Sequence, residues 1–304
     1  MISAVTLQSI LERVERGGRL TGACRLTGGV SADVYRLDYL DASEGPQSVV
    51  LRVHGERHGG MAAALEYALL SALFETGLPV AEPLLVDDSR TLLPYPFLVI
   101  AFVAGDSIID AVALPQRLDA LANGLSRVHG TSLTTLPELP ARLDPLPEVF
   151  EFLPSGAQWQ PLETALRAVN DRISTAFEGP VKLLHGDYWP ENLLWRDDRL
   201  VAMLDWEDAA FGDPLSDVAG AGLELRYLFG REAMVAFIAA YERKNPALSI
   251  DPARLALWQV YVAGAAQRYM GQWGLPAKKE AHMRQEALAT IADAAAVIVH
   301  SFGS

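Results

Sequence analysis

The stretch LLHGDYWPENLLW, residues 183–195, places polar side chains on a short loop between two apolar ends. Asp187 and Asn192 both lie on this loop, with Pro190 between them. Taken alone, the pattern could be an ordinary turn in which Asp187 caps the backbone and Asn192 ends the loop. Apolar ends that anchor a loop in a core also fix the positions of its polar groups, as a functional site requires.

A second stretch, VAMLDWEDAAFGDPLSD (201–217), contains an apolar strand that is predicted to end at Asp205. A hairpin separates it from the first stretch. The loop that carries Asp187 and Asn192 comes just before the hairpin, and Asp205 comes at its end. Because the two ends of a hairpin lie side by side, we expect these three residues to lie close together. Amide and carboxylate oxygens suit Mg²⁺, which also binds phosphate oxygens, and Asp187 would remain free to accept a proton. Phosphoryl transfer requires this combination of groups.

The motifs HGDYWPEN (185–192) and LDWEDAAFGDP (204–214) resemble the two signature motifs of the aminoglycoside phosphotransferase and choline kinase family, a branch of the protein-kinase-like fold. The resemblance extends to a nucleotide loop, a third strand and a hinge in LTGGVSADVYRLDY (26–39), VVLRV (49–53) and PFLVIAFVAGDSI (96–108).

The fold class that this resemblance implies is α+β and bilobal. Residues 1–103 would form a small β-rich nucleotide-binding lobe with a five-stranded antiparallel sheet plus helices. Residues 104–304 would form a larger, mostly helical lobe with the catalytic loop, the metal site and the acceptor pocket.

The resemblance also implies roles for single residues. Asp187 would be the catalytic base, Asn192 and Asp205 would bind Mg²⁺, and His185 and Asp217 would support the catalytic loop. ATP or GTP would be the phosphate donor. The implied nucleotide-binding residues are Gly28, Gly29, Ser31, Arg52, Glu66, Ala101, Phe102 and Val103.

Arg52 departs from the family pattern, in which this position of the third strand is usually lysine. No lysine precedes Lys182, so no nearby lysine can take its place. Arginine keeps the positive charge and can bind phosphate through two nitrogens at once. We therefore expect Arg52 to pair with Glu66 and to contact the α- and β-phosphates.

The acceptor is predicted only as a class of small molecule. Carboxylates near the motifs favour a cationic or polyhydroxylated alcohol, and the family's range includes aminoglycosides, macrolides, choline or ethanolamine, homoserine and sugars. The candidate pocket residues are Glu207, Asp208, Glu224, Trp258 and Tyr261, although each aromatic residue taken singly is more typical of a core position. The alternative function is a catalytically silent nucleotide-binding scaffold of the same fold.

Charge and composition limit the classes of binding partner and the cellular compartments that this chain suits. The 304 residues include 25 basic and 38 acidic side chains, a net charge of −13, which disfavours nucleic acid and anionic membranes as partners. No signal peptide and no membrane-spanning run are visible. Cys24 is the only cysteine, which fits a reducing compartment and a cytoplasmic protein; we expect it to be a small buried hydrophobe. The oligomeric state is not predicted.

Apolar periodicity predicts the elements around these motifs. The Pro-rich segment 135–156 is expected to pass over the surface. Strands are expected at 20–27, 31–40, 47–53, 83–87, 96–103, 181–184, 192–195 and 200–204. Helices are expected at 5–16, 60–76, 113–129, 158–177, 214–229, 232–243, 252–273 and 278–300.

Overall fold

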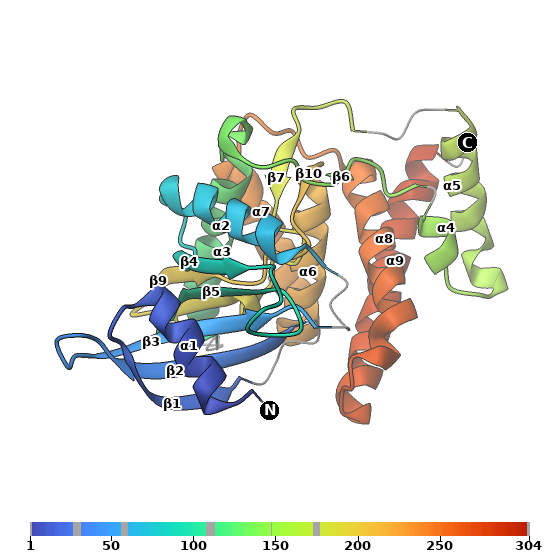
Figure 1. Cartoon of the computed structure of the whole chain (residues 1–304). Helices are drawn as coiled ribbons and strands as arrows, with labels where there is room; N and C mark the ends of the chain where they lie inside the picture. The colour runs from blue at the N-terminus through green and yellow to red at the C-terminus, as the bar shows by residue number, and fades with distance from the viewer. Residues whose placement is uncertain are drawn as a thin grey trace. The chain divides into compact units, whose positions relative to one another are not determined.

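The computed structural model describes residues 2–26, 32–55, 60–107, 113–146, 148–172 and 177–302 (Figure 1). The chain separates into two compact units. The first comprises Met1–Asp106, Thr134–Glu138 and Leu193–Asp208, and the second comprises Ser107–Leu133, Leu139–Asn192 and Ala209–Ser304. The first unit thus includes a hairpin from late in the sequence, and a lobe boundary at residue 103 stays a prediction.

The first unit is built on one antiparallel sheet of five strands in the order β1-β2-β3-β5-β4. Its strands are β1 (Arg19–Arg25), β2 (Asp33–Leu40), β3 (Pro46–Val53), β4 (Pro83–Asp87) and β5 (Phe97–Ala101). The unit's hairpin consists of β8 (Leu193–Arg196) and β9 (Arg199–Met203). Asp197 and Asp198 form its turn with positive φ angles, a conformation that aspartate adopts more readily than most residues.

Two helices cover this sheet. The hydroxyl of Ser3 caps α1 (Ala4–Val14) by accepting a hydrogen bond from the Thr6 N–H at 3.1 Å. The buried side chains of α1 pack against apolar residues of β2, β3 and β5 in one core. The second helix, α2 (Ala63–Glu75), packs against β4 and β5 and carries the buried Glu66.

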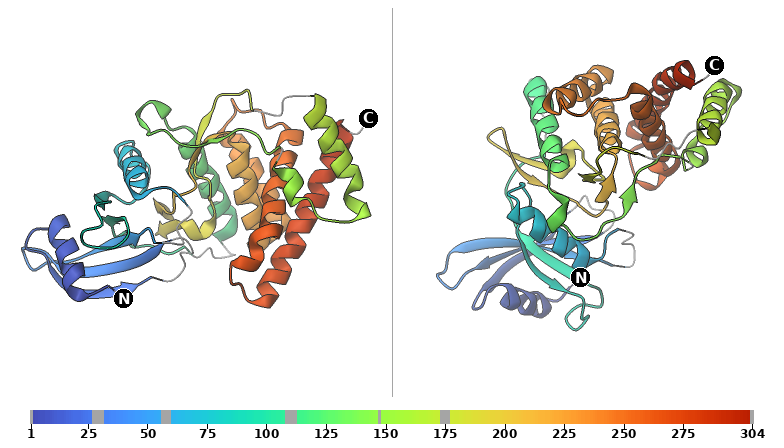
Figure 2. Two further views of the ribbon diagram at one scale, coloured as in Figure 1. Left: turned by 45° about the vertical axis from the view of Figure 1, so that its right-hand side comes forward. Right: turned by 90° about the horizontal axis from the view of Figure 1, so that it is seen from above.

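The second unit is mostly helical. Its larger helices are α3 (Leu114–His129), α5 (Gln160–Arg172), α6 (Leu215–Phe229), α7 (Arg231–Lys244), α8 (Pro252–Tyr269) and α9 (Ala277–Phe302). Helices α8 and α9 run side by side (Figure 1 and Figure 2). They share an apolar core with α5, α6 and the short helix α4 (Val149–Phe152).

A small three-stranded sheet completes the second unit, with the order β6-β10-β7. Its strands are β6 (Ala141–Arg142), β7 (Lys182–Leu184) and β10 (Ala210–Gly212). At Gly212, an added Cβ would lie 1.9 Å from the Arg142 carbonyl oxygen, so only glycine allows β6 and β10 to approach this closely.

Several expectations from the sequence were wrong in detail. The Pro-rich segment contributes β6 and buries Leu139, Leu146 and Val149, so part of it belongs to the core rather than the surface. Strand β10 was not anticipated, and the helix expected at 252–273 ends as α8 at Tyr269 before a 3-10 turn. Cys24 is exposed, because β1 is an edge strand of its sheet.

Within the described ranges, no helix is long and apolar enough to span a bilayer.

Candidate functional site

The predicted catalytic loop in the second unit holds Asp187 and Asn192 in contact. The loop turns at Gly186, whose φ of 87° is a conformation that favours glycine. The Nδ2 group of Asn192 donates to the Asp187 carbonyl oxygen at 2.9 Å and to its carboxylate Oδ2 at 2.8 Å. Because the amide nitrogen of Asn192 is directed at Asp187, its Oδ1 is the atom that faces away from this pair and can accept a cation.

Asp217 supports this loop from below. It lies in the first turn of α6 and its side chain is 1% exposed. Its Oδ2 accepts the His185 N–H at 2.7 Å, and its Oδ1 accepts the Gly186 N–H at 3.0 Å. Burial by itself raises the pKa of the Asp217 carboxyl, but hydrogen bonds and positive charge from the neighbouring histidines outweigh it and leave the pKa below its ordinary value.

His129 connects Asp217 to the helical core. Its Nε2 lies 3.2 Å from Asp217 Oδ2, and its Nδ1 lies 2.6 Å from the Tyr241 hydroxyl. His129 is therefore a buried structural histidine. The sequence motif alone gave no sign that it would contact Asp217.

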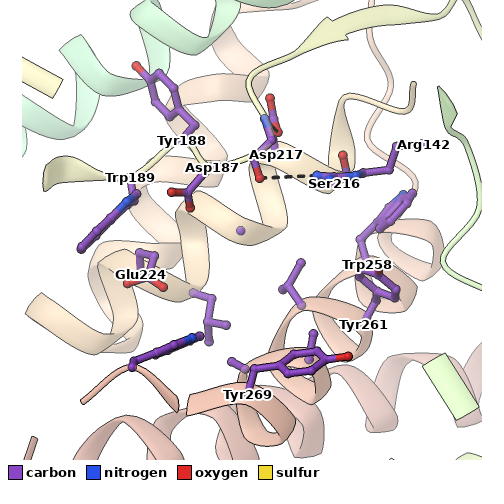
Figure 3. A pocket seen from close by; sticks show the side chains of 17 residues that line it. Arg142, Asp187, Tyr188, Trp189, Ser216, Asp217, Glu224, Trp258, Tyr261 and Tyr269 are labelled. Atoms are coloured by element: carbon purple, nitrogen blue, oxygen red, sulfur yellow. Dashed lines mark hydrogen bonds between the residues drawn. The ribbon is translucent and has the colours of Figure 1, made fainter. Parts of the chain in front are cut away.

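A cavity of about 440 Å³ opens beside the catalytic loop in the second unit (Figure 3). Asp187 and Glu224 both lie at it. Burial, followed by the charges of Asp187 and Glu191, raises the pKa of Glu224 to about 8, so this carboxyl is mostly protonated at neutral pH. Trp258 and Tyr261 line the cavity, together with Arg142, Trp189, Tyr269 and Trp273.

The first unit contains a separate cavity of about 260 Å³ with an apolar slot and a charged end. Val34, Val50 and Met203 belong to the slot, which suits a flat apolar base. The charged end consists of Arg52, Glu66 and Asp205.

Arg52 joins the charged groups of this cavity. Its Nε lies 3.3 Å from Glu66 Oε1, and its terminal nitrogen donates to Asp205 Oδ1 at 3.0 Å. Burial opposes the charge of Arg52, but these two carboxylates raise the pKa of its guanidinium above the ordinary value. His54 Nε2 lies 3.1 Å from the other Glu66 oxygen. The expected pairing of Arg52 with Glu66 is therefore present, and Asp205 is a second partner.

The predicted hinge residues line the same cavity, but two of their three N–H groups are already bonded. The Ala101 N–H donates to the Glu82 carbonyl at 2.8 Å, and the Phe102 N–H donates to the Ser48 carbonyl at 3.4 Å. Of the three, Val103 has the N–H group that bonds to no other part of the described chain.

Some predicted site residues cannot be placed beside the catalytic loop. Gly28, Gly29 and Ser31 lie outside the described residues. Asp205, Glu207 and Asp208 belong to the first unit, whereas Asp187 and Asn192 belong to the second, so the convergence of these groups stays a prediction.

Each unit by itself offers an oxygen of the kind that a divalent cation such as Mg²⁺ prefers. Asn192 offers Oδ1, and Asp205 offers a carboxylate on a residue with a φ of 61°. A positive φ at a non-glycine residue is strained and is frequent at functional sites. The Arg52 contact with Asp205 would have to adjust when a cation binds. In the described part of the chain, no group of three or more His, Cys, Asp or Glu side chains forms a metal cluster.

Comparisons with known proteins agree with this architecture. The model of the phosphotransferase enzyme family matches residues 22–258. A protein from Ralstonia eutropha that is provisionally assigned to the aminoglycoside phosphotransferases aligns with a TM-score of 0.70 at 16% identity, covering 98% of both chains. A thermostable mutant of aminoglycoside phosphotransferase APH(4)-Ia, bound to AMP-PNP and hygromycin B, aligns with a TM-score of 0.63 at 17% identity, covering 94% of this chain and 98% of that one. The predicted α+β, protein-kinase-like fold is thereby confirmed.

The curated relatives match about half of this chain and a smaller share of their own length. Acyl-CoA dehydrogenase family member 11 of Rattus norvegicus is 26% identical over 180 residues, which are 52% of this chain. The match spans 22% of that relative, so about a fifth of its length corresponds to this chain.

Proposed function

Because the chain belongs to the phosphotransferase enzyme family, we propose that it transfers the γ-phosphate of ATP to a hydroxyl group of a small molecule. The Asp187–Asn192 pair on a loop supported by Asp217 is the observation that carries this proposal. A solved relative that holds AMP-PNP together with a small molecule supports the choice of donor and acceptor class.

In this proposal Asp187 is the catalytic base. It orients the acceptor hydroxyl and accepts its proton as the hydroxyl oxygen forms a bond to the γ-phosphorus, while the bond from that phosphorus to the bridging oxygen of ADP breaks. His185 and Asp217 act as positioning residues, because the backbone bonds of the loop end on the Asp217 carboxylate.

The first unit would bind the nucleotide. Its apolar slot suits the adenine, and the Val103 N–H is available to it, while Ala101 and Phe102 contribute wall atoms. Arg52, held by Glu66, would contact the phosphates. The loop with Gly28, Gly29 and Ser31 would cover the phosphates, and residues 1–103 would form most of the nucleotide-binding lobe.

Mg²⁺, when bound, would neutralise charge on the phosphates. Asn192 and Asp205 would hold it through oxygen atoms. We assign ATP rather than GTP as the phosphate donor because the slot of the first unit is apolar.

The test is ADP release from Mg-ATP with a panel of alcohols that includes an aminoglycoside, a macrolide, choline, homoserine and several sugars and hydroxy acids. We expect release that depends on an acceptor and stops when EDTA removes the cation. ATP binding without any release across the panel would favour the alternative, a catalytically silent nucleotide-binding scaffold. Absence of ATP binding would contradict the proposal.

A further inference from the structure

The cavity beside the catalytic loop has few charges that are free to meet a ligand. Its charged lining residues are Arg142, Asp187, Asp217 and Glu224. Asp217 already accepts hydrogen bonds from two backbone N–H groups and has His129 beside it. Asp187 is the proposed base. Arg142 and Glu224 are therefore the groups that decide which charge an acceptor should carry.

Arg142 is a half-buried cation that has no acidic partner in the described part of the chain. One of its terminal nitrogens donates to the Gly186 carbonyl at 3.4 Å, and no carboxylate lies within ion-pair distance of it. Figure 3 shows its side chain directed toward the loop that carries Asp187. A guanidinium has several donors in a planar fork that matches a carboxylate, and burial makes an unpaired charge costly. Arg142 thus has donors that a ligand can use.

Glu224 does not provide the opposite preference. Burial and the nearby Asp187 and Glu191 charges leave its carboxyl mostly protonated at neutral pH. Lys279 is the cationic side chain that acts on it most, and it only partly offsets these effects. A ligand with several ammonium groups would need several ionised carboxylates, which this cavity does not offer among its lining residues.

The aromatic residues of the cavity direct their polar atoms elsewhere. The Trp258 indole N–H donates to Asp213 Oδ2 at 2.5 Å, and the Tyr261 hydroxyl donates to Glu148 Oε2 at 2.8 Å. Their rings, with Leu223, Val262, Ala265 and Ala266, leave an apolar wall along the cavity. Such a wall suits a hydrocarbon or aromatic ligand body.

We infer that the acceptor is an alcohol with an apolar body and one carboxylate group, which Arg142 binds. This inference rests on the proposed function, because that function places the hydroxyl of the acceptor at Asp187. The apolar wall then receives the body of the molecule. The inference replaces the cationic or polyhydroxylated acceptor expected from the sequence with an anionic hydroxy acid.

The test is direct binding to the 304-residue chain without nucleotide, measured by titration calorimetry. The probes are hydroxymethyl-phenylpropanoate, its amide and the corresponding propylamine, which differ in charge but share the alcohol and the ring. The carboxylate should bind at least about ten-fold more tightly than the other two. Arg142→Gln should remove that advantage and leave the affinity for the amide within about two-fold. Arg167→Gln, which changes an exposed arginine outside the cavity, should change none of the three affinities.

Equal or tighter binding of the amine or the amide to the unmodified protein would overturn the inference, as would failure of the carboxylate to bind. An equal loss of amide and carboxylate affinity in Arg142→Gln would overturn it too, because Arg142 would then act only through the shape of the loop. ADP release with the same three probes separates this inference from the proposed function. Tight carboxylate binding through Arg142 without phosphorylation would support the carboxylate subsite and contradict the proposed function. ADP release with the amine alone would support the proposed function and contradict the carboxylate subsite.

Discussion

Removing the Asp217 carboxylate should destabilise the second unit and misplace the catalytic loop. Asp217→Ala leaves the His185 and Gly186 N–H groups and the His129 ring without the acceptor that lies 2.7, 3.0 and 3.2 Å away. Hydrogen bonds to a charged group contribute about 1.5–3 kcal/mol each, but bonds to one shared acceptor do not add. We therefore expect the free energy of unfolding to fall by about 3–5 kcal/mol, as when one partner of a buried ion pair is deleted. That is a large part of a typical stability of about 5–15 kcal/mol.

The loss can be measured by urea unfolding followed by far-ultraviolet circular dichroism. Asp217→Asn should lose less, about 1–3 kcal/mol, because one carboxamide oxygen remains as an acceptor. Glu163→Gln is the matched control; its exposed pair with Arg167 should contribute less than about 1 kcal/mol. In Asp217→Asn the turnover number should fall while ATP affinity is retained, as expected of a positioning residue. An Asp217→Ala protein as stable as the unmodified one would refute this reasoning.

Three further changes test other parts of the account. Glu224→Gln should have the melting temperature of the unmodified protein near pH 4.5 and a higher melting temperature above about pH 8. The reason is that the folded state retains a proton on Glu224 that the unfolded chain releases from pH 4.5 upward. Equal melting temperatures of the two proteins at both pH values would contradict the raised pKa. Gly212→Ala should lower the free energy of unfolding by about 2–3 kcal/mol, since the new Cβ meets the Arg142 carbonyl oxygen, and urea unfolding that matches the unmodified protein would argue against this close approach. Arg52→Met should lower the free energy of unfolding by about 3–5 kcal/mol, because the Glu66 side chain is 2% exposed and would lose its cation. In a thermal melt, Arg52→Lys should be much less destabilised than Arg52→Met. A methionine variant with normal stability would show that the Arg52–Glu66 pair contributes little.

The catalytic loop could be predicted from the sequence because its groups are close along the chain. Asp187 and Asn192 are separated by a short segment, so the motif alone determines that they can touch. Arg52 and Glu66 came from the resemblance rather than from local pattern, and the structure places them 3.3 Å apart.

Other features depend on contacts that no local pattern reveals. Arg142 reaches the cavity because β6 pairs in parallel with β10, a contact between segments far apart in the sequence. His129 meets Asp217 through the packing of helices that are also distant along the chain. Cys24 was misplaced because alternation within a strand does not say whether that strand lies at the edge of its sheet.

The measurement that tests the central claim most directly compares the turnover numbers of Asp187→Asn and the unmodified protein, with ATP and the best acceptor of the panel. Asp198→Asn is the control, because it makes the same chemical change at a hairpin turn whose positive φ asparagine tolerates. We expect Asp187→Asn to lose about 10²–10⁴-fold in turnover, with ATP affinity retained, and Asp198→Asn to lose nothing. An Asp187→Asn protein that turns over at the unmodified rate would contradict the assignment of Asp187 as the catalytic base.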